Sequence, residues 1–208
     1  MAGKNILLVE GSDDEHVVRH LCDHHGLLPH PSIANLGGVE KLIDSFPTRL
    51  KESDVHALGV LVDADTNLQA RWQSLHGHLR QAGYSPLPES LTATGIVLPA
   101  PVDSLLPRAG IWLMPDNRTN GILEDFLRFL VPLDSPLFAH VEQSVDSIPA
   151  TEQRFSDLAK PKAVIHTWLA WQEEPGKPLG TAITAKYLDA GLPAVNDFIS
   201  WLRQLFYS

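Results

Sequence analysis

The chain has 208 residues, of which 44% are hydrophobic, and it carries a formal charge of −9 from 16 basic and 25 acidic side chains. This length and composition favour one globular domain with a sizeable core and exclude disorder over most of the chain. The negative charge argues against nonspecific binding to a polyanion, because such binding depends on basic residues that displace condensed counterions.

Cysteine content and the N-terminal residues limit the cellular setting. The single cysteine, Cys22, excludes an internal disulfide framework and a cysteine-based zinc site, and we expect it to be a small buried apolar residue. The first apolar run, residues 6–9, is too short for the core of a signal peptide or for a membrane span. We therefore expect a soluble cytoplasmic protein with no membrane partner.

The first half of the chain predicts strands that alternate with helices. Mostly apolar runs predict buried strands at residues 4–10, 31–36 and 57–65, as in parallel sheets. A helix is predicted from Ser12, which we expect to be its N-cap, to a stop at Gly26. Further helices are predicted after Gly37-Gly38 and over residues 67–81.

The second half of the chain predicts one more pair of strands and then helices alone. Residues 94–98 and 110–114 are predicted strands, and the connection between them is too short for a crossover helix, so we expect them to pair antiparallel. Helices are predicted over 121–131, 135–147, 162–172, 181–189 and 195–206. The fold class is therefore α/β: a mostly parallel sheet flanked by helices. We place the core at residues 1–131 and a helical C-terminal elaboration, packed on the same domain, at 132–208.

The two clearest strands end in acidic residues. Glu10 ends the first strand, and Asp63 and Asp65 end the third, at the edge where open parallel sheets collect their chemistry. An extended backbone would point Asp63 and Asp65 the same way, and Glu10 and Asp14 are spaced to face one cavity across a turn. Crowded carboxylates repel one another unless a cation neutralises them, and oxygen ligands suit Mg²⁺ or Mn²⁺. A structural role remains open, because such acids are common after strands and also suit helix N-termini.

These motifs resemble a known family. Val9-Glu10-Gly11-Ser12-Asp13-Asp14, followed by Val62-Asp63-Ala64-Asp65, resembles the Toprim domain of topoisomerases, primases and OLD-type nucleases. The resemblance implies a Rossmann-like Toprim fold for the core. It also implies that Glu10, Asp63 and Asp65 bind Mg²⁺ and that Glu10 serves as general acid or base. We expect Asp14 to assist as a ligand or through a bound water.

A closer resemblance is to small standalone Toprim-like proteins related to the OLD nucleases. It is carried by Gly110-Ile111-Trp112-Leu113-Met114-Pro115-Asp116-Asn117 and by Gly121-Ile122-Leu123-Glu124. It implies a second metal held by Glu124, with support from Asp116, although Ile122 stands where the related pattern sometimes has serine. It also implies a charge-neutralising lysine, either Lys160 or Lys162. Gly11 and Arg118 are candidates for binding phosphate.

These observations predict Mg²⁺- or Mn²⁺-dependent phosphodiester hydrolysis on nucleic acid. One alternative is a non-catalytic Toprim-like module in a multi-protein system. The other is a receiver-like phosphoacceptor at Asp63, although Lys160-Pro161 lies two helices beyond the position where a receiver carries its Lys-Pro. Because the charge is −9, we expect nucleic-acid binding to be weak without a metal ion, a basic patch or a protein partner such as an ATPase.

Histidine and tryptophan stripes have simpler explanations than catalysis. His16, His20 and His24 share one helix face, which we expect to be solvated. Trp168, Trp171 and Trp201 could stack bases, but their helical spacing among apolar residues favours burial in the core. The choice between DNA and RNA, the polarity of cleavage, the number of metal ions and the oligomeric state stay open at this level.

Overall fold

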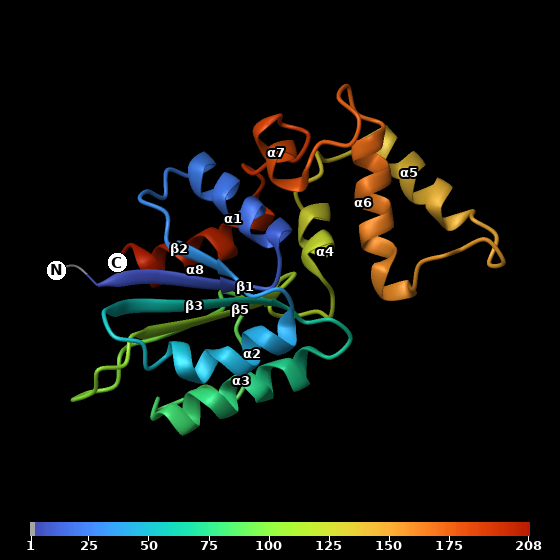
Figure 1. Cartoon of the computed structure of the whole chain (residues 1–208). Coiled ribbons are helices and arrows are strands. Elements are labelled where there is room, and N and C mark those ends of the chain that lie inside the picture. The colour runs from blue at the N-terminus through green and yellow to red at the C-terminus, as the bar shows by residue number, and fades with distance from the viewer. Residues whose placement is uncertain (1–2) are drawn as a thin grey trace.

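A five-stranded sheet forms the centre of the computed structural model, which describes residues 3–208. The strands are β1 (Lys4–Val9), β2 (Ser32–Asn35), β3 (Val55–Asp63), β4 (Ile96–Leu98) and β5 (Arg108–Met114), in the order β2-β1-β3-β5-β4 (Figure 1). β1 runs parallel to β2 and β3, and β3 runs parallel to β5, whereas β4 is antiparallel to β5. The predicted α/β class, the mostly parallel sheet and its antiparallel pair are confirmed.

Helices cover both faces of this sheet. α1 (Ser12–His24) and α8 (Asn196–Phe206) lie on one face, and α2 (Val39–Arg49) and α3 (Leu68–Ala82) lie on the other (Figure 1). Alternate residues of a strand point to opposite faces, so Leu7 and Val9 join the first core and Ile6 and Leu8 join the second. The apolar runs are continuous because both faces of each strand are buried.

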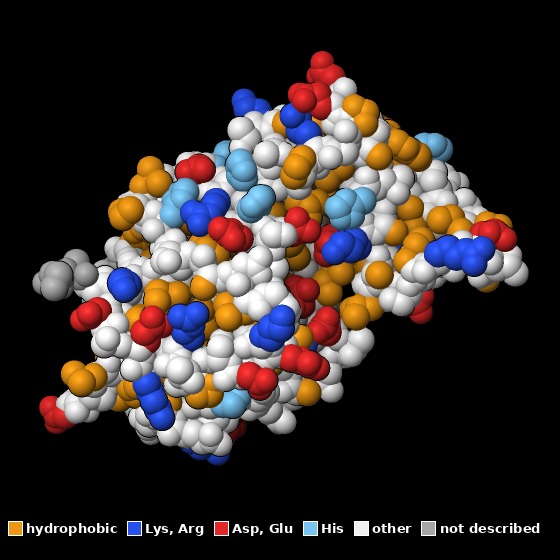
Figure 2. Space-filling model, viewed as in Figure 1, with side chains coloured by type: hydrophobic (Ala, Val, Ile, Leu, Met, Phe, Trp, Pro, Cys, Tyr) orange, Lys and Arg blue, Asp and Glu red, His pale blue; other side chains and the backbone are white. Residues whose placement is uncertain are grey.

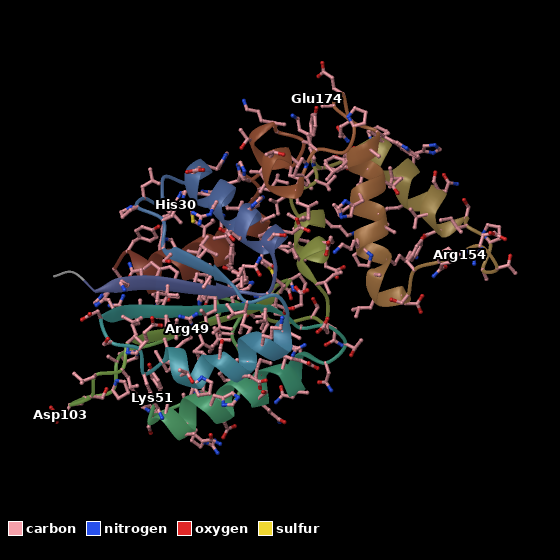
Figure 3. The ribbon with its side chains drawn as sticks, in the orientation of Figure 1. His30, Arg49, Lys51, Asp103, Arg154 and Glu174 are labelled. Carbon is pink, nitrogen blue, oxygen red and sulfur yellow. The ribbon has the colours of Figure 1, made fainter. Side chains whose placement is uncertain are left out.

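The remaining helices follow the sheet in sequence. They are α4 (Leu123–Arg128), α5 (Pro136–Asp146), α6 (Lys160–Ala170) and α7 (Leu179–Thr184), with short 3₁₀ turns at Asp157–Ala159 and Pro193–Val195. Within residues 3–208 no strand follows β5, as predicted. α5 and α6 pack on each other and project away from the sheet, while α7 lies against α1 (Figure 1). Asp103 in the β4–β5 connection and Arg154 in the α5–α6 connection mark opposite ends of the molecule (Figure 3).

The C-terminal helix completes the core of the sheet. Leu205 of α8 is fully buried against glycines of the two central strands. A Cβ added at Gly110 of β5 would lie 2.5 Å from Leu205 Cδ2, and one added at Gly59 of β3 would lie 2.9 Å from the same atom. Glycine at these positions lets the helix approach the strands closely.

Three local features bear on the sequence predictions. Gly11, and not Ser12, is the N-cap of α1, so the predicted serine cap is wrong. Cys22 is buried, as predicted. Trp168 and Trp201 are buried, but Trp171 follows the last turn of α6, packs on His140 and is 43% exposed, so its predicted place in the core is wrong. No helix formed by residues 3–208 is both long and apolar enough to cross a bilayer.

Candidate functional site

A cavity of about 290 Å³ opens at the carboxyl ends of β1 and β3. Five acidic residues line it: the exposed Asp13 and four more buried acids, which are Glu10 after β1, Asp14 in α1, Asp63 at the end of β3 and Glu124 in α4. Lys162 of α6 also lines the cavity. We call Glu10, Asp14, Asp63 and Glu124 the carboxylate cluster. Figure 2 shows acidic side chains gathered at this edge of the sheet, with basic and histidine side chains along one border.

The same capping hydrogen bond fixes the start of both helices that contribute acids to the cluster. The Asp14 carboxylate accepts a hydrogen bond from the Gly11 amide at 2.9 Å, and the Asp125 carboxylate accepts one from the Ile122 amide at 3.0 Å. In each case the third helical residue satisfies the N–H of the N-cap. In α4 this arrangement leaves Glu124, the second helical residue, buried in the cavity.

Gly121 is required for the entry into α4. Its φ is +151°, and a Cβ at this position would lie 2.6 Å from the capping carboxylate oxygen of Asp125. Any larger residue would therefore displace the group that fixes the start of the helix. The glycine of the Gly121-Ile122-Leu123-Glu124 segment thus has a structural role, and the glutamate is the residue presented to the cavity.

Hydrogen bonds between two loops bring Glu124 beside Asp63. The Asp65 amide donates to the Gly121 carbonyl at 2.9 Å. The Asn120 side chain accepts from the Leu68 amide and donates to the Thr66 carbonyl, each at 2.8 Å. These bonds join the β3–α3 loop to the β5–α4 loop, so acids 61 positions apart in sequence share one cavity.

Burial and mutual repulsion disfavour the charged forms of these carboxyl groups. Burial, followed by the negative charges of Glu10 and Asp14, raises the pKa of Asp63 to about 9. Burial, with a smaller contribution from Glu10 and Glu124, raises the pKa of Asp14 to about 7. Burial also raises the pKa of Glu10, although the hydrogen bond from the Asp63 amide opposes the shift. At neutral pH the cluster therefore favours taking up protons or another cation.

The hydrogen bonds of the cluster leave one buried oxygen without a donor. Glu10 Oε1 accepts from the Asp63 amide at 2.8 Å, and Glu124 Oε1 lies 3.2 Å from Lys162 Nζ. Asp63 Oδ1 is buried and receives no hydrogen bond from any residue in the described part of the chain. Among residues 3–208, no three His, Cys, Asp or Glu side chains are already arranged as a metal-binding group.

Asp65 was predicted to bind the metal together with Asp63, but it does not line the cavity of the carboxylate cluster. β3 ends at Asp63, and Asp65 has a φ of +53°, so the extended backbone that would align the two side chains stops before Asp65. The Asp65 carboxylate instead lies 2.5 Å from Arg71 Nη2, and Arg71 Nε donates to the Asp63 carbonyl oxygen at 3.1 Å. This ion pair is the main departure from the expected site.

Three other candidate residues also lie outside the cavity. Asp116 Oδ1 accepts from the Arg118 amide and from both the amide and the hydroxyl of Thr119, so its own loop uses this oxygen. Arg118 is exposed in that loop and lines a separate cavity together with Asp116. Lys160 Nζ pairs with Asp146 of α5 at 2.7 Å. Of the two candidate lysines, only Lys162 reaches the cluster, and of the two predicted phosphate-binding residues only Gly11 lines the cavity.

Two residues of the site region were missed by sequence reasoning. Arg71 lies in the first turn of α3, six positions after Asp65, a spacing that suits a side chain folded back over a loop. Asp125 caps α4, and its place after Glu124 matches the third-position acid that is typical of helix starts. In both cases the type of residue was a usable signal, but its partner depended on the shape of the loop.

The predicted histidine face is only partly solvated. His16 and His24 are exposed on α1, whereas His20 Nδ1 lies 2.7 Å from Thr184 Oγ1 of α7. His20 and His24 line a separate cavity between α1 and α7. These histidines contribute no side chain to the cavity of the carboxylate cluster.

Comparison with known proteins identifies a family but no activity. The family model described as "Protein of unknown function (DUF3226)" matches residues 4–207, almost the whole chain. Neither the curated proteins nor the solved structures contain a match. What the protein does must therefore be inferred from the chemistry of the cavity.

Proposed function

The chain belongs to the DUF3226 family, and from its site we propose that it is a Toprim-like, Mg²⁺- or Mn²⁺-dependent phosphodiesterase that acts on nucleic acid. The order of the strands and the acids at the ends of β1 and β3 support the Toprim-like assignment. One observation carries the catalytic proposal: the four acids of the carboxylate cluster come from four separate parts of the chain to one cavity, where a single lysine pairs with one of them.

The residues of the cavity suit a hard divalent cation. Carboxylate oxygens are the ligands that Mg²⁺ and Mn²⁺ prefer. The buried Asp63 Oδ1, which receives no hydrogen bond from residues 3–208, offers a lone pair for such an ion. The raised pKa values of Asp14 and Asp63 have the same implication, because a cation would replace the protons that these groups otherwise retain. We assign the ion to Asp63, Asp14, Glu10 and Glu124.

Two residues of the cavity, Glu10 and Lys162, have roles in the proposed reaction beyond lining the metal site. The bound ion would supply Lewis-acid activation of the phosphate and of an attacking water. Glu10, whose pKa burial raises above its ordinary value, is suited to move a proton to or from the reacting oxygen. Lys162 is half exposed and keeps its charge, since the Glu124 carboxylate raises its pKa. It would therefore stabilise negative charge that develops on the phosphate.

The test is cleavage by the purified full-length chain. Supercoiled plasmid, single-stranded DNA and RNA are incubated with Mn²⁺, with Mg²⁺ and with EDTA. We expect cleavage of at least one substrate with a divalent ion, and its loss in Asp63→Asn and Glu124→Gln. Asp44→Asn, which changes an exposed acid of α2, is the matched control and should cleave like the wild type. Absence of cleavage on all three substrates, together with absence of Mn²⁺ binding, would refute the proposal.

A second function is favoured by the cations already present in the site. Lys162 pairs with Glu124 and Arg71 pairs with Asp65, so part of the acidic charge is offset without a metal ion. A non-catalytic module of a multi-protein system that includes a partner such as an ATPase would keep such ion pairs as permanent structure. Mn²⁺ binding without cleavage of any of the three substrates would favour this module over the phosphodiesterase.

A further inference from the structure

We infer that the cavity holds one divalent ion, and that Arg71, positioned by Asp65, supplies the positive charge that a second ion would bring. This inference rests on the proposed function, because it specifies how that site is built. It departs from the pattern implied by the Toprim resemblance, in which both acids of Asp63-Ala64-Asp65 bind metal.

The supply of acidic ligands limits the number of ions that the site can hold. Glu10, Asp14, Asp63 and Glu124 all line the same cavity, so the structure forms one acidic group and not two. A second ion would need ligands from Asp65 or Asp116. Asp65 is engaged by Arg71, and Asp116 Oδ1 is used by three donors of its own loop.

Two contacts hold Arg71 beside the aspartates of the β3–α3 loop. Its Nη2 lies 2.5 Å from Asp65 Oδ2, and its Nε donates to the Asp63 carbonyl oxygen at 3.1 Å. The guanidinium therefore bridges the main chain of one acid and the side chain of the next. Only 17% of the Arg71 side chain and 34% of the Asp65 side chain are exposed, so water competes less with this pair than with a surface pair.

The backbone of the loop keeps Asp65 in place. Asp65 adopts the left-handed conformation that non-glycine residues rarely use, and its amide donates to the Gly121 carbonyl. Asn120 then holds both ends of the following turn through Thr66 and Leu68. The loop directs the Asp65 carboxylate to the arginine, so Asp65 is a positioning residue for a fixed cation beside Asp63.

The test counts Mn²⁺ ions by calorimetry on the full-length chain. We expect one ion per wild-type chain, and one ion still in Asp65→Asn, with a loss of affinity of about 10–100-fold, as for an outer-sphere partner. Asp63→Asn should bind no ion in the same range. Arg71→Gln should bind a second, weaker ion because Asp65 is released, whereas Arg71→Lys should still bind one. A purely structural arginine would make the Gln and Lys variants alike.

The possible failures can be told apart. Two ions on the wild type, or loss of an ion in Asp65→Asn, would overturn the single-ion inference and leave the phosphodiesterase proposal in place. One ion in Arg71→Gln would overturn the role of Arg71 as a replacement for the second cation. A wild type that binds no Mn²⁺ would refute the proposed function and the single-ion site together.

A metal-free measurement decides the positioning role by itself. Asp65→Asn, Arg71→Gln and the double variant are unfolded in denaturant with EDTA present. We expect the double variant to lose no more stability than the worse single variant, because both changes break one interaction. Additive losses would show that Asp65 does not position Arg71, whatever the calorimetry gives.

Discussion

Replacing Asp63 with asparagine should stabilise the metal-free protein, and more so at high pH. The folded chain raises the pKa of Asp63 from its ordinary value of 3.8 to about 9. Between these values the unfolded chain has lost a proton that the folded chain keeps. Stability therefore falls as pH rises through this window, because the folded state binds more protons. Asparagine carries no titrating proton and removes this slope.

The size of the effect follows from the width of the pH interval. From pH 5 to pH 8, both inside the window, one proton over three pH units corresponds to an upper bound of about 4 kcal/mol. Water reaches buried sites and raises their effective dielectric constant, so we expect the advantage of Asp63→Asn over the wild type to grow by about 2 kcal/mol.

The assay is urea unfolding with EDTA at pH 5 and pH 8. Because only the difference between variants is compared, titrations common to both chains cancel. Asp44→Asn serves as the exposed control, and its difference from the wild type should be the same at both pH values. An Asp63→Asn advantage that is equal at pH 5 and pH 8, or that shrinks as pH rises, would refute the electrostatic account of the cluster.

The remaining predictions concern the metal, the lysines, the loops and the packing of α8. Saturating Mn²⁺ at about 100 times its dissociation constant should stabilise the wild type by about 2.7 kcal/mol in thermal or urea unfolding, and EDTA should reverse the gain; no change would argue against a metal site. Lys162→Gln should slow plasmid cleavage by about tenfold or more, whereas Lys160→Gln, whose partner is Asp146, should not; equal loss in both would contradict the assignment. Asn120→Ala should cost about 1–3 kcal/mol of unfolding free energy, because it removes both side-chain bonds that join the two loops, and a change below the error of the urea measurement would contradict their role. Gly110→Ala should lower the free energy of unfolding by about 1–3 kcal/mol, because the added methyl group would overlap Leu205. The control is Gly77→Ala, in a helix with open space around it, which should raise the free energy of unfolding by about 0.5–1 kcal/mol. A neutral Gly110→Ala would contradict the close packing of α8.

The sequence predicted the strands well because their signal is local. Strands buried on both faces need continuous apolar runs, and these runs appear in β1, β3 and β5. The carboxyl ends of parallel strands share one edge, so Glu10 and Asp63 could be placed together before any coordinates. The position of α8 on the sheet was not predicted, because the contact between Gly110 and Leu205 joins residues 95 positions apart.

The second acid of the Asp63-Ala64-Asp65 segment shows where such reasoning stops. Spacing two residues apart aligns side chains only while the backbone stays extended, and β3 ends at the first of the two aspartates. No local signal distinguishes an aspartate that ends a strand from one that has turned into the left-handed region. The partner of Asp65, Arg71, is brought near by the loop and not by the strand.

The sequence could not distinguish Lys162 from Lys160 as the lysine of the cavity, for a similar reason. α6 begins at Lys160, two residues before its predicted start, and two positions on a helix point about 200° apart. Lys160 therefore reaches Asp146 of α5, whereas Lys162 reaches Glu124 of α4. Which of them faces the cavity depends on how α6 packs against α4, and that packing has no signature in the sequence around either lysine.

The charges of the site set an order of binding for the proposed reaction. Glu10, Asp14, Asp63 and Glu124 can carry four negative charges, against one positive charge each on Lys162 and Arg71, and Arg71 is also paired with Asp65. A phosphodiester that entered this cavity without a metal ion would meet net repulsion, and a chain charge of −9 offers no long-range attraction to offset it. A divalent ion adds two positive charges at the point where the phosphate must lie. We therefore expect the ion to bind before the nucleic acid, and we expect the negative charge of the chain to disfavour nucleic acid where no ion is bound.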